Sequence, residues 1–302
     1  MATTIRTSDP RRIEAGQDYA ALNSAGLTYS QIASRYGVTR GQVSNDIALF
    51  RREVEKEAKR FEVTSLGTPM RVRCDNALVV GDVHVPCTDY EFSKLVMLVA
   101  RKQNIKTLIV AGDTFNADSF SKYQAVVPAP TWAQERDAAR VLFAEWTDWF
   151  DDIYVIMGNH DRRIQKVTAG QFSESDIFGM VSTSAKIHTS NFGYMTLETA
   201  AGDWLVTHSS QYSVNQLTVA DQLALKHQCN VMTHHEHHAA VGWDRYGRYV
   251  IVNNGTLADP AKLAYVTLDD SKNAVMQNAF TVLRNGVPRL YGRAPMTDWS
   301  EI

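Results

Sequence analysis

The chain of 302 residues is 44% hydrophobic, which is enough for a full-sized core, and its formal net charge of −2 gives no argument for or against a polyanionic partner. It has three cysteines, an odd number without a Cys-x-x-Cys pair, so its composition implies no disulfide framework. Because no run approaches 18 apolar residues, and because a signal-peptide segment and a glycine-rich nucleotide loop are both missing from the sequence, we expect a cytoplasmic protein without membrane segments.

Residues 1–60 are predicted to form a small all-helical module, with residues 61–74 as a connector. The segments 28–31 and 39–42 both read Thr-x-x-Gln, a helix-start pattern in which the hydroxyl and the Gln side chain satisfy free backbone donors. Gly37 lies between them and suits the left-handed position that ends a helix. Two short helices joined by a tight glycine-containing turn predict a helix-turn-helix.

The second of these helices would present side chains of base-reading types to a DNA major groove, namely Arg40, Gln42 and Asn45. Residues 1–60 hold 10 Lys and Arg against 7 Asp and Glu, so the front of the chain is basic. The alternative is a helical packing or dimerisation module, because glutamates between residues 53 and 57 interrupt the basic face. We therefore expect DNA as a partner, and a homodimer stays open by analogy with other helix-turn-helix proteins.

Over residues 75–302 the pattern changes to strands alternating with helices, which predicts an α/β domain. Apolar residues at helical spacing predict helices over 88–103 and 131–150, with a long loop over 115–130. The later strands are expected to be antiparallel, and they cover 193–199, 204–207, 230–233 and 249–253.

Three aliphatic runs, 77–80, 107–111 and 153–157, are predicted to be buried strands because they are short and rich in β-branched residues. Each run is followed by polar residues: Gly81-Asp82-Val83-His84, Gly112-Asp113 and Gly158-Asn159-His160-Asp161. Two later strands end in His208 and in the cluster 234–238. Ligands bind outside the carboxyl ends of such strands, so we expect a metal site at this edge of the sheet.

This order of blocks resembles the calcineurin-like metallophosphoesterase family, whose pattern is Asp-x-His, Gly-Asp, Gly-Asn-His-Asp/Glu, a single His and Gly-His-x-His. The resemblance covers about residues 76–259, and residues 253–256 are similar to the family's closing segment. It implies a two-sheet β-sandwich flanked by helices, an αββα architecture. With the N-terminal module added, the chain resembles the DNA-repair-exonuclease branch of the family and phage-type proteins, which would place it in the cytoplasm of a host cell.

The resemblance also implies two divalent metal ions and a ligand set. Asp82, His84 and His237 would hold one ion, Asn159, His208 and His235 would hold the other, and Asp113 would bridge them. His160 would face the substrate phosphate, and Asp161 would orient a neighbouring side chain. The fifth block departs from the family, because His234 stands where the family usually has Gly.

Mixed Asp, Asn and His ligands suit borderline divalent ions, Mn²⁺ first, with Fe²⁺, Zn²⁺, Ni²⁺ and Mg²⁺ as alternatives. Two ions that share a carboxylate lie roughly 3.5–4 Å apart, and a water between them loses a proton near neutral pH. The resulting hydroxide would attack phosphorus in line, while His160 stabilises charge on the phosphoryl oxygens. The leading hypothesis is a phosphodiesterase that cleaves DNA. The alternatives are a phosphomonoesterase, a cyclic-nucleotide phosphodiesterase and a catalytically inactive DNA-binding regulator.

Several further residues lie beside these blocks. Arg162 and Arg163 follow the third block, and they either pair with substrate phosphate or flank a helix start. Asn116, like residues 122–123 in the same long loop, is a candidate for substrate contact. Cys87 is expected to be a small buried residue rather than a ligand.

Overall fold

The computed structural model describes residues 10–59, 67–122, 127–264 and 276–302. The chain divides into two compact units, Met1–Gly67 and Thr68–Ile302. Tyr123 and residues 61–66 of the expected connector lie outside the described residues. Among the helices of the described residues, none combines the length and the apolarity that crossing a bilayer requires.

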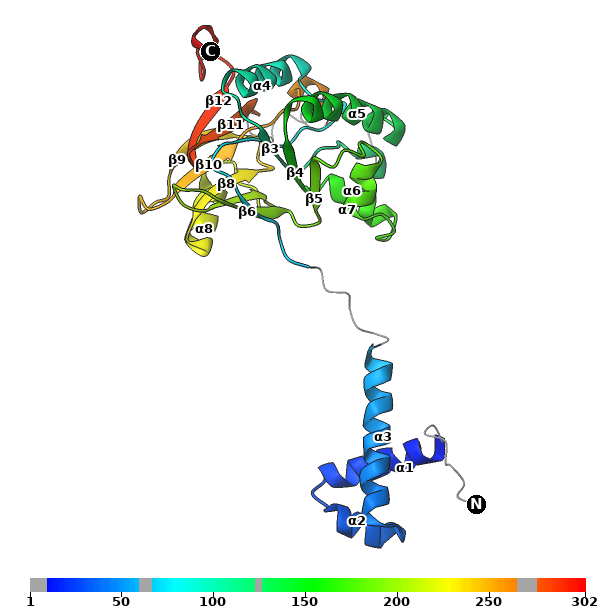
Figure 1. Ribbon diagram of the computed structural model, residues 1–302. Helices are drawn as coiled ribbons and strands as arrows, with labels where there is room; N and C mark the ends of the chain where they lie inside the picture. Colours follow the sequence, from blue (N-terminus) through cyan, green and yellow to red (C-terminus); the bar gives the residue numbers. More distant parts are fainter. Residues whose placement is uncertain (1–9, 60–66, 123–126, 265–275) are drawn as a thin grey trace. The chain divides into compact units, whose positions relative to one another are not determined.

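The described residues of the first unit form three helices, α1 (Pro10–Ser24), α2 (Tyr29–Tyr36) and α3 (Arg40–Lys59) (Figure 1). Both expected capping boxes are confirmed. Thr28 Oγ1 accepts the N–H of Gln31 at 3.4 Å, Thr39 Oγ1 accepts that of Gln42 at 3.2 Å, and each Gln Oε1 accepts the N–H of its Thr in return. Gly37 has a φ of 67° after α2, so the predicted left-handed helix end is confirmed as well.

The core of this unit also uses α1, which no sequence pattern singled out. Gly16 lets α1 approach α3 closely, because a Cβ at this position would lie 2.1 Å from the backbone oxygen of Asp46. The Asp46 carboxylate pairs with Arg12 of α1 at 2.5 Å. The buried apolar side chains are Tyr19, Ile32, Ala33, Val43 and Ile47. This packing accounts for a stable three-helix unit, and its role as a DNA-reading module stays a prediction.

In the second unit, the residues that the structure describes form two six-stranded sheets. The first sheet has the order β12-β11-β2-β3-β4-β5. Strands β2 to β5 run parallel to one another, and β11 is antiparallel to both of its neighbours, β2 and β12. Its strands are β2 (Ala77–Val80), β3 (Thr107–Ala111), β4 (Asp152–Ile156), β5 (Ile187–Ser190), β11 (Ala279–Arg284) and β12 (Val287–Gly292). The second sheet has the order β1-β6-β7-β8-β10-β9. Its strands are β1 (Arg71–Arg73), β6 (Tyr194–Glu198), β7 (Trp204–His208), β8 (Asn230–His234), β9 (Ala239–Trp243) and β10 (Val250–Asn254).

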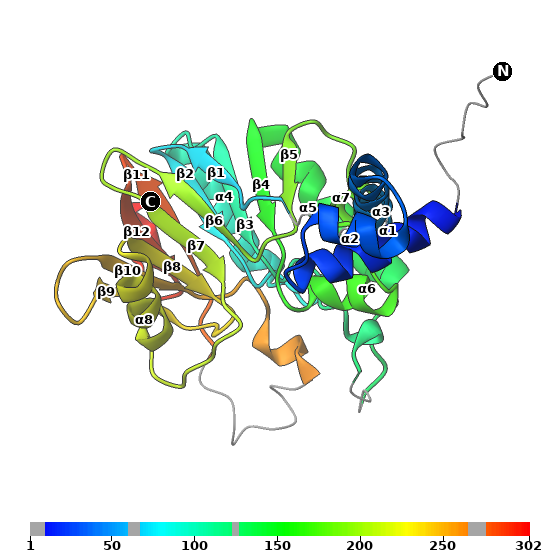
Figure 2. The ribbon, with the colours of Figure 1, turned by 90° about the horizontal axis from the view of Figure 1, so that it is seen from below.

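Helices cover the outer faces of the two sheets, so the predicted αββα sandwich is confirmed (Figures 1 and 2). The helices of this unit are α4 (Tyr90–Lys102), α5 (Trp132–Trp149), α6 (Asp161–Val167), α7 (Glu174–Gly179) and α8 (Thr218–His227), with short 3-10 helices η1 (Asp118–Phe120), η2 (Pro260–Lys262) and η3 (Trp299–Glu301). Alternate residues of each strand face opposite layers. In β3, Leu108 and Val110 share a core with α4 and α5, whereas Ile109 faces the second sheet. In β8, Val231 packs under α8 and Met232 faces the first sheet.

The expectation that the later strands are antiparallel is wrong for three of them. β6 and β7 are antiparallel, but β7, β8 and β10 run parallel. The reason is the two connections: α8 carries the chain back between β7 and β8, and β9 returns it between β8 and β10 as an antiparallel edge strand. The parallel register pairs His208 with His234, so the ends of β7 and β8 deliver histidines to the same edge.

Candidate metal centre

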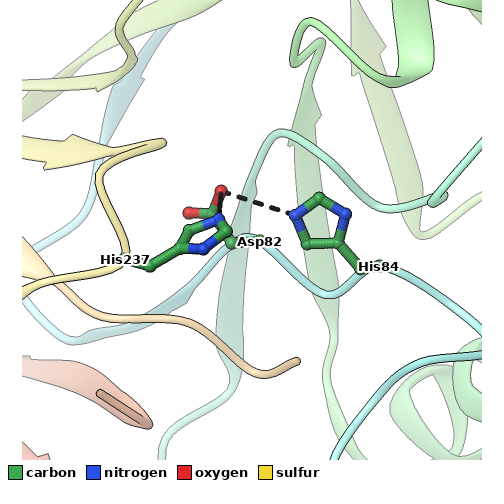
Figure 3. Close-up of side chains that lie close together, drawn as sticks. All are labelled: Asp82, His84 and His237. Carbon is green, nitrogen blue, oxygen red and sulfur yellow. Dashed lines mark hydrogen bonds and ion pairs between the residues drawn. The ribbon is translucent and has the colours of Figure 1, made fainter. Parts of the chain in front are cut away.

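The predicted ligands come from the carboxyl ends of five strands, β2, β3, β4, β7 and β8. Among the described residues, three groups of side chains offer ligand atoms that all lie within 4.8 Å of one another. These groups are Asp82–His84–His237, His84–Asp113–His160 and Asp113–His208–His235. Figure 3 shows the first group, in which the two rings face the Asp82 carboxylate from different elements.

Tight backbone turns aim these side chains inward. Five predicted ligands have a positive φ, which non-glycine residues rarely adopt: Asp82 at 50°, His84 at 48°, Asp113 at 49°, His235 at 92° and His237 at 58°. Each such residue costs on the order of 1–3 kcal/mol, and such strain persists only where the surrounding structure enforces it. The surrounding structure therefore holds the backbone in turns that bring these side chains together.

The first group is centred on Asp82. Its Oδ1 lies 3.0 Å from His237 Nε2 and 3.9 Å from His84 Nε2. Neither ring nitrogen of His84 has a hydrogen-bond partner among the described residues, although the side chain is fully buried. A buried unpaired nitrogen is costly, and imidazole is the commonest metal ligand, so this group fits a divalent ion.

The second group is centred on Asp113. Its Oδ2 lies 3.2 Å from His208 Nε2, which is itself 3.0 Å from Asn159 Oδ1, and the His208 and His235 rings lie 5.2 Å apart. The same Asp113 oxygen lies 3.8 Å from His84 Nε2 in the first group. Asp113 therefore stands between the two groups, where a bridging carboxylate would stand.

In this cluster, burial and the neighbouring charges shift the pKa values of His208 and Asp113 in opposite directions. Burial disfavours charge on His208, but Asp113 and Asp82 outweigh it and raise the pKa of His208 to about 9. Burial likewise disfavours ionised Asp113, yet His208 and His160 hold its pKa well below the usual range. Burial keeps the pKa of His84 low. The cluster thus combines ionised carboxylates with a neutral imidazole, a donor set that suits a dication.

His160 lies beside this cluster, but both of its ring nitrogens are engaged. Nδ1 lies 2.6 Å from the carbonyl oxygen of Asn116, and Nε2 lies 3.0 Å from Arg163 Nη2. A guanidinium only donates, so Nε2 accepts and Nδ1 carries the hydrogen. His160 also falls within ligand distance of His84 and Asp113. His84 is therefore the more available donor of the two, because both nitrogens of His160 are paired and those of His84 are not.

Of the predicted substrate-contacting residues, Asn116 and Arg163 lie beside the cluster and Arg162 does not. Arg163 donates to the carbonyl of Asn116 at 3.1 Å and to Asp118 Oδ1 at 2.7 Å, so Asn116, His160 and Arg163 meet beside the cluster. Arg162 points elsewhere, because its guanidinium is hydrogen-bonded to the carbonyl and the side chain of Asn191. The structure therefore brings Arg163, and not Arg162, to the candidate centre.

Three predicted DNA-contacting residues, Arg40, Gln42 and Asn45, are exposed on α3 of the first unit. The side-chain oxygen of Gln42 is used in the capping box.

Cys87 is buried, as expected, and burial raises the pKa of its thiol to about 11. It belongs to none of the ligand groups that the described residues form.

Asp161 joins the second and third blocks. It accepts the N–H of Phe115 at 3.1 Å and that of Gly158 at 2.9 Å. Burial and the neighbouring Asp113 raise its pKa to about 7. This geometry suits a residue that holds two ligand-bearing turns together.

Two buried carboxylates were missed by the sequence patterns. Glu135 of α5 accepts the N–H of Ala117 at 2.8 Å, and burial raises its pKa to about 8. Glu236, between two predicted ligands, accepts the N–H of Ser213 at 3.2 Å and the side-chain amide of Asn253 at 2.8 Å. Each carboxylate anchors a loop that borders the candidate centre, and no local sequence signal marks either one.

An α/β sandwich that gathers buried Asp and His side chains beyond its strand ends is typical of metal-dependent hydrolases. Comparison of the sequence with family models matches residues 76–264 to the calcineurin-like phosphoesterase family. The match covers more than half of the chain, and the chain belongs to this family. This membership supports a metal-dependent phosphoesterase.

No curated protein matches the chain. Among solved structures, it is similar to the phosphoesterase YfcE from E. coli, with 13% identity over 70% of this chain and 88% of that one and a TM-score of 0.38. It is also similar to Vps29 from Chaetomium thermophilum, with 10% identity, 73% and 95% coverage and a TM-score of 0.39. A third similar structure is zinc-complexed Vps29 from Entamoeba histolytica, with 13% identity, 72% and 98% coverage and a TM-score of 0.34. Similarities at this level do not assign an activity.

Proposed function

We propose that this protein is a dinuclear, Mn²⁺-dependent phosphodiesterase that cleaves DNA. The observation that carries the proposal is the position of Asp113, whose Oδ2 lies 3.8 Å from His84 and 3.2 Å from His208 in two different ligand groups. One carboxylate between two sets of candidate ligands is what a two-metal site needs. Asp82, His84 and His237 would hold one ion, and Asn159, His208 and His235 the other.

When bound, such ions activate a water molecule as nucleophile and neutralise charge on the phosphoryl oxygens. The chain's own residues would position the phosphate and its leaving group. Arg163 is held by Asp118 and Asn116 with its guanidinium beside His160, so it would donate to a phosphoryl oxygen. The Asn116 carbonyl holds a hydrogen on His160 Nδ1, so Nε2 accepts from Arg163 and would orient the guanidinium toward the phosphate.

The preference for DNA is supported by the first unit. Arg40 and Asn45 are exposed near the start of α3, on the helix that follows the turn at Gly37. Arg and Asn are residue types that read base edges in the major groove. Removal of residues 1–67 is expected to leave hydrolysis of a small aryl diester within about twofold, but to weaken DNA binding and flatten its salt dependence. A collapse of diester turnover would instead make this unit part of the catalytic fold.

The central test is cleavage of labelled single- and double-stranded DNA with Mn²⁺, alongside bis(p-nitrophenyl) phosphate and p-nitrophenyl phosphate. We expect DNA and diester cleavage by the wild type, loss of both in Asp113→Ala, and two ions per chain in the wild type only. Preference for the monoester would favour a phosphatase. Two bound ions without cleavage of any DNA would reject the nuclease half of the proposal. A chain that retains no ions would favour the inactive regulator.

A further inference from the structure

His234 is the position at which the fifth block departs from the family pattern, and the structure gives it a defined environment. It is the last residue of β8 and is 1% exposed. Its ring occupies space that Gly81 leaves free, because a Cβ on Gly81 would lie 2.3 Å from His234 Nδ1. The imidazole and the glycine are therefore a matched pair across the two sheets.

The contacts of the ring fix which nitrogen carries its hydrogen. Nε2 lies 3.3 Å from the side-chain nitrogen of Asn254, and that nitrogen also donates to the carbonyl oxygen of Val79 at 2.9 Å. The Val79 carbonyl needs a donor, so the Asn254 amide has its nitrogen on this side. An amide nitrogen only donates, so His234 Nε2 accepts and Nδ1 carries the hydrogen. Nδ1 lies 3.5 Å from Asp82 Oδ2, and this nitrogen has no hydrogen-bond partner among the described residues.

The two oxygens of Asp82 consequently have different surroundings. Oδ2 faces His234 and also accepts the backbone N–H of His235 at 3.1 Å. Oδ1 faces His237 Nε2 at 3.0 Å, and His84 Nε2 and His208 Nδ1 each lie 3.9 Å from it. His234 belongs to none of the ligand groups that the described residues form, although Asp82 belongs to one. The ring therefore approaches Oδ2, whereas His237 and His84 approach Oδ1.

We propose that His234 is a positioning residue whose unpaired Nδ1 hydrogen bonds Oδ2 of Asp82 when the ion is bound, so that Oδ1 is presented to the ion of the Asp82–His84–His237 group. This inference rests on the metal centre of the proposed function but not on the identity of the substrate. Groups that hydrogen-bond a metal-binding side chain from behind typically change metal affinity about 10- to 100-fold when removed. The effect should fall on the ion of this group, because the His234 ring faces Asp82, whereas His235 and His208 of the other group are its chain neighbour and its backbone register partner.

The alternative is that His234 only fills the space above Gly81. Two substitutions separate these roles. His234→Leu keeps much of the buried volume without a donor, whereas His234→Asn can place an amide N–H near the position of Nδ1. His188→Leu is the matched control, because His188 also pairs with an aspartate, Asp152 at 2.9 Å, but lies on β5 outside the ligand groups of the described residues.

The experiment is titration of chelator-treated protein with Mn²⁺, read as bound ions per chain by calorimetry and elemental analysis, with the thermal unfolding of the metal-free protein measured in parallel. In His234→Leu we expect one of the two ions to bind about 10- to 100-fold more weakly and the other to bind as in the wild type. In His234→Asn we expect most of the affinity to return, and in His188→Leu both ions to bind normally.

If His234→Leu binds both ions like the wild type and only its unfolding temperature falls, the residue is a space filler and the inference is overturned. Equal weakening of both ions overturns it as well. Should the Leu variant not fold, His234→Gly, the residue typical of the family, takes its place with the same expected readout. A wild-type chain that binds fewer than two ions would overturn the proposed function itself, which distinguishes that failure from this one.

Discussion

Gly158 lies so close to Asp113 that a Cβ on the glycine would sit 2.1 Å from Asp113 Oδ1 and 2.3 Å from its backbone nitrogen. The glycine of the third block is therefore a steric requirement of the proposed bridging carboxylate, and not only a turn residue. The same Asp113 oxygen accepts the backbone N–H of His160 at 2.8 Å, so the third block wraps directly around the second. A methyl group at residue 158 must move either the turn or the carboxylate.

The first prediction follows from this contact. Gly158→Ala should lower the turnover of a phosphodiester by at least about 10²-fold, because misplacement of a reacting group by roughly 1 Å has that effect. It should also reduce the number of Mn²⁺ ions retained per chain. Gly179→Ala is the control, since a Cβ there meets nothing within 4 Å. Normal metal content in Gly158→Ala would show that Asp113 tolerates the contact.

The second prediction concerns the pH dependence of stability and the buried Glu135. Burial raises its pKa from 4.5 to about 8, so the folded chain holds this proton over a range in which the unfolded chain has released it. Because the folded state binds more protons in that range, stability is full below about pH 4.5 and falls as pH rises toward 8. The slope contributed by one such proton is up to about 1.4 kcal/mol per pH unit.

Glu135→Gln should remove this contribution while its side-chain oxygen still accepts the N–H of Ala117. We expect the free energy of unfolding of the metal-free variant, measured by urea titration between pH 5 and 8, to fall less steeply than that of the wild type. Identical slopes would mean that Glu135 is already ionised in the folded protein.

The sequence predicted the parts of this structure that local chemistry determines. The Thr-x-x-Gln caps at Thr28 and Thr39 and the buried strands β2 to β4 depend on neighbours along the chain, and all were found. Helix α8 was missed because it lacks a start signal: Leu217 precedes it with a φ of 64° and no side-chain cap. Without α8, β7 and β8 were expected to be antiparallel, which is wrong.

The missed residues of the candidate centre depend on tertiary contacts. Glu135 lies on an amphipathic helix, where a carboxylate is ordinarily solvent-facing, and only the packing of α5 against the loop at Ala117 buries it. The contact of His234 with Gly81 joins residues from two different sheets. Spacing along one sequence carries no information about such a pair, whereas it does place ligands at the ends of strands.

The third prediction separates the two adjacent arginines. Arg163→Ala should lower turnover of bis(p-nitrophenyl) phosphate by about 10²-fold, as for loss of one preorganised donor to a developing charge. Arg162→Ala should leave turnover within about twofold and lower the free energy of unfolding by about 1 kcal/mol, since only hydrogen bonds to Asn191 are lost. Equal losses of turnover in the two variants would contradict the arrangement in which only Arg163 reaches His160.

The fourth prediction concerns Tyr212, whose ring is 49% exposed and lies 6.5 Å from that of His238, next to the proposed ligand His237. Its loop is fastened to the histidine block, because Glu236 accepts the N–H of Ser213. An exposed aromatic ring at the border of a phosphodiesterase site would stack on a nucleobase, an interaction of about 1–3 kcal/mol.

Tyr212→Ala should therefore raise KM for thymidine 5′-(p-nitrophenyl phosphate) by about 5- to 150-fold, the equivalent of that stacking energy, and leave KM for methyl p-nitrophenyl phosphate unchanged. Tyr246→Ala is the matched control. Tyr246 is 66% exposed, but it lies in the turn between β9 and β10, at the sheet edge opposite the one that carries the proposed ligands. A tyrosine that only supports the loop would affect both substrates alike. The difference between the two substrates thus tests whether this site accepts a base beside the phosphate, which a nuclease requires and a simple phosphatase does not.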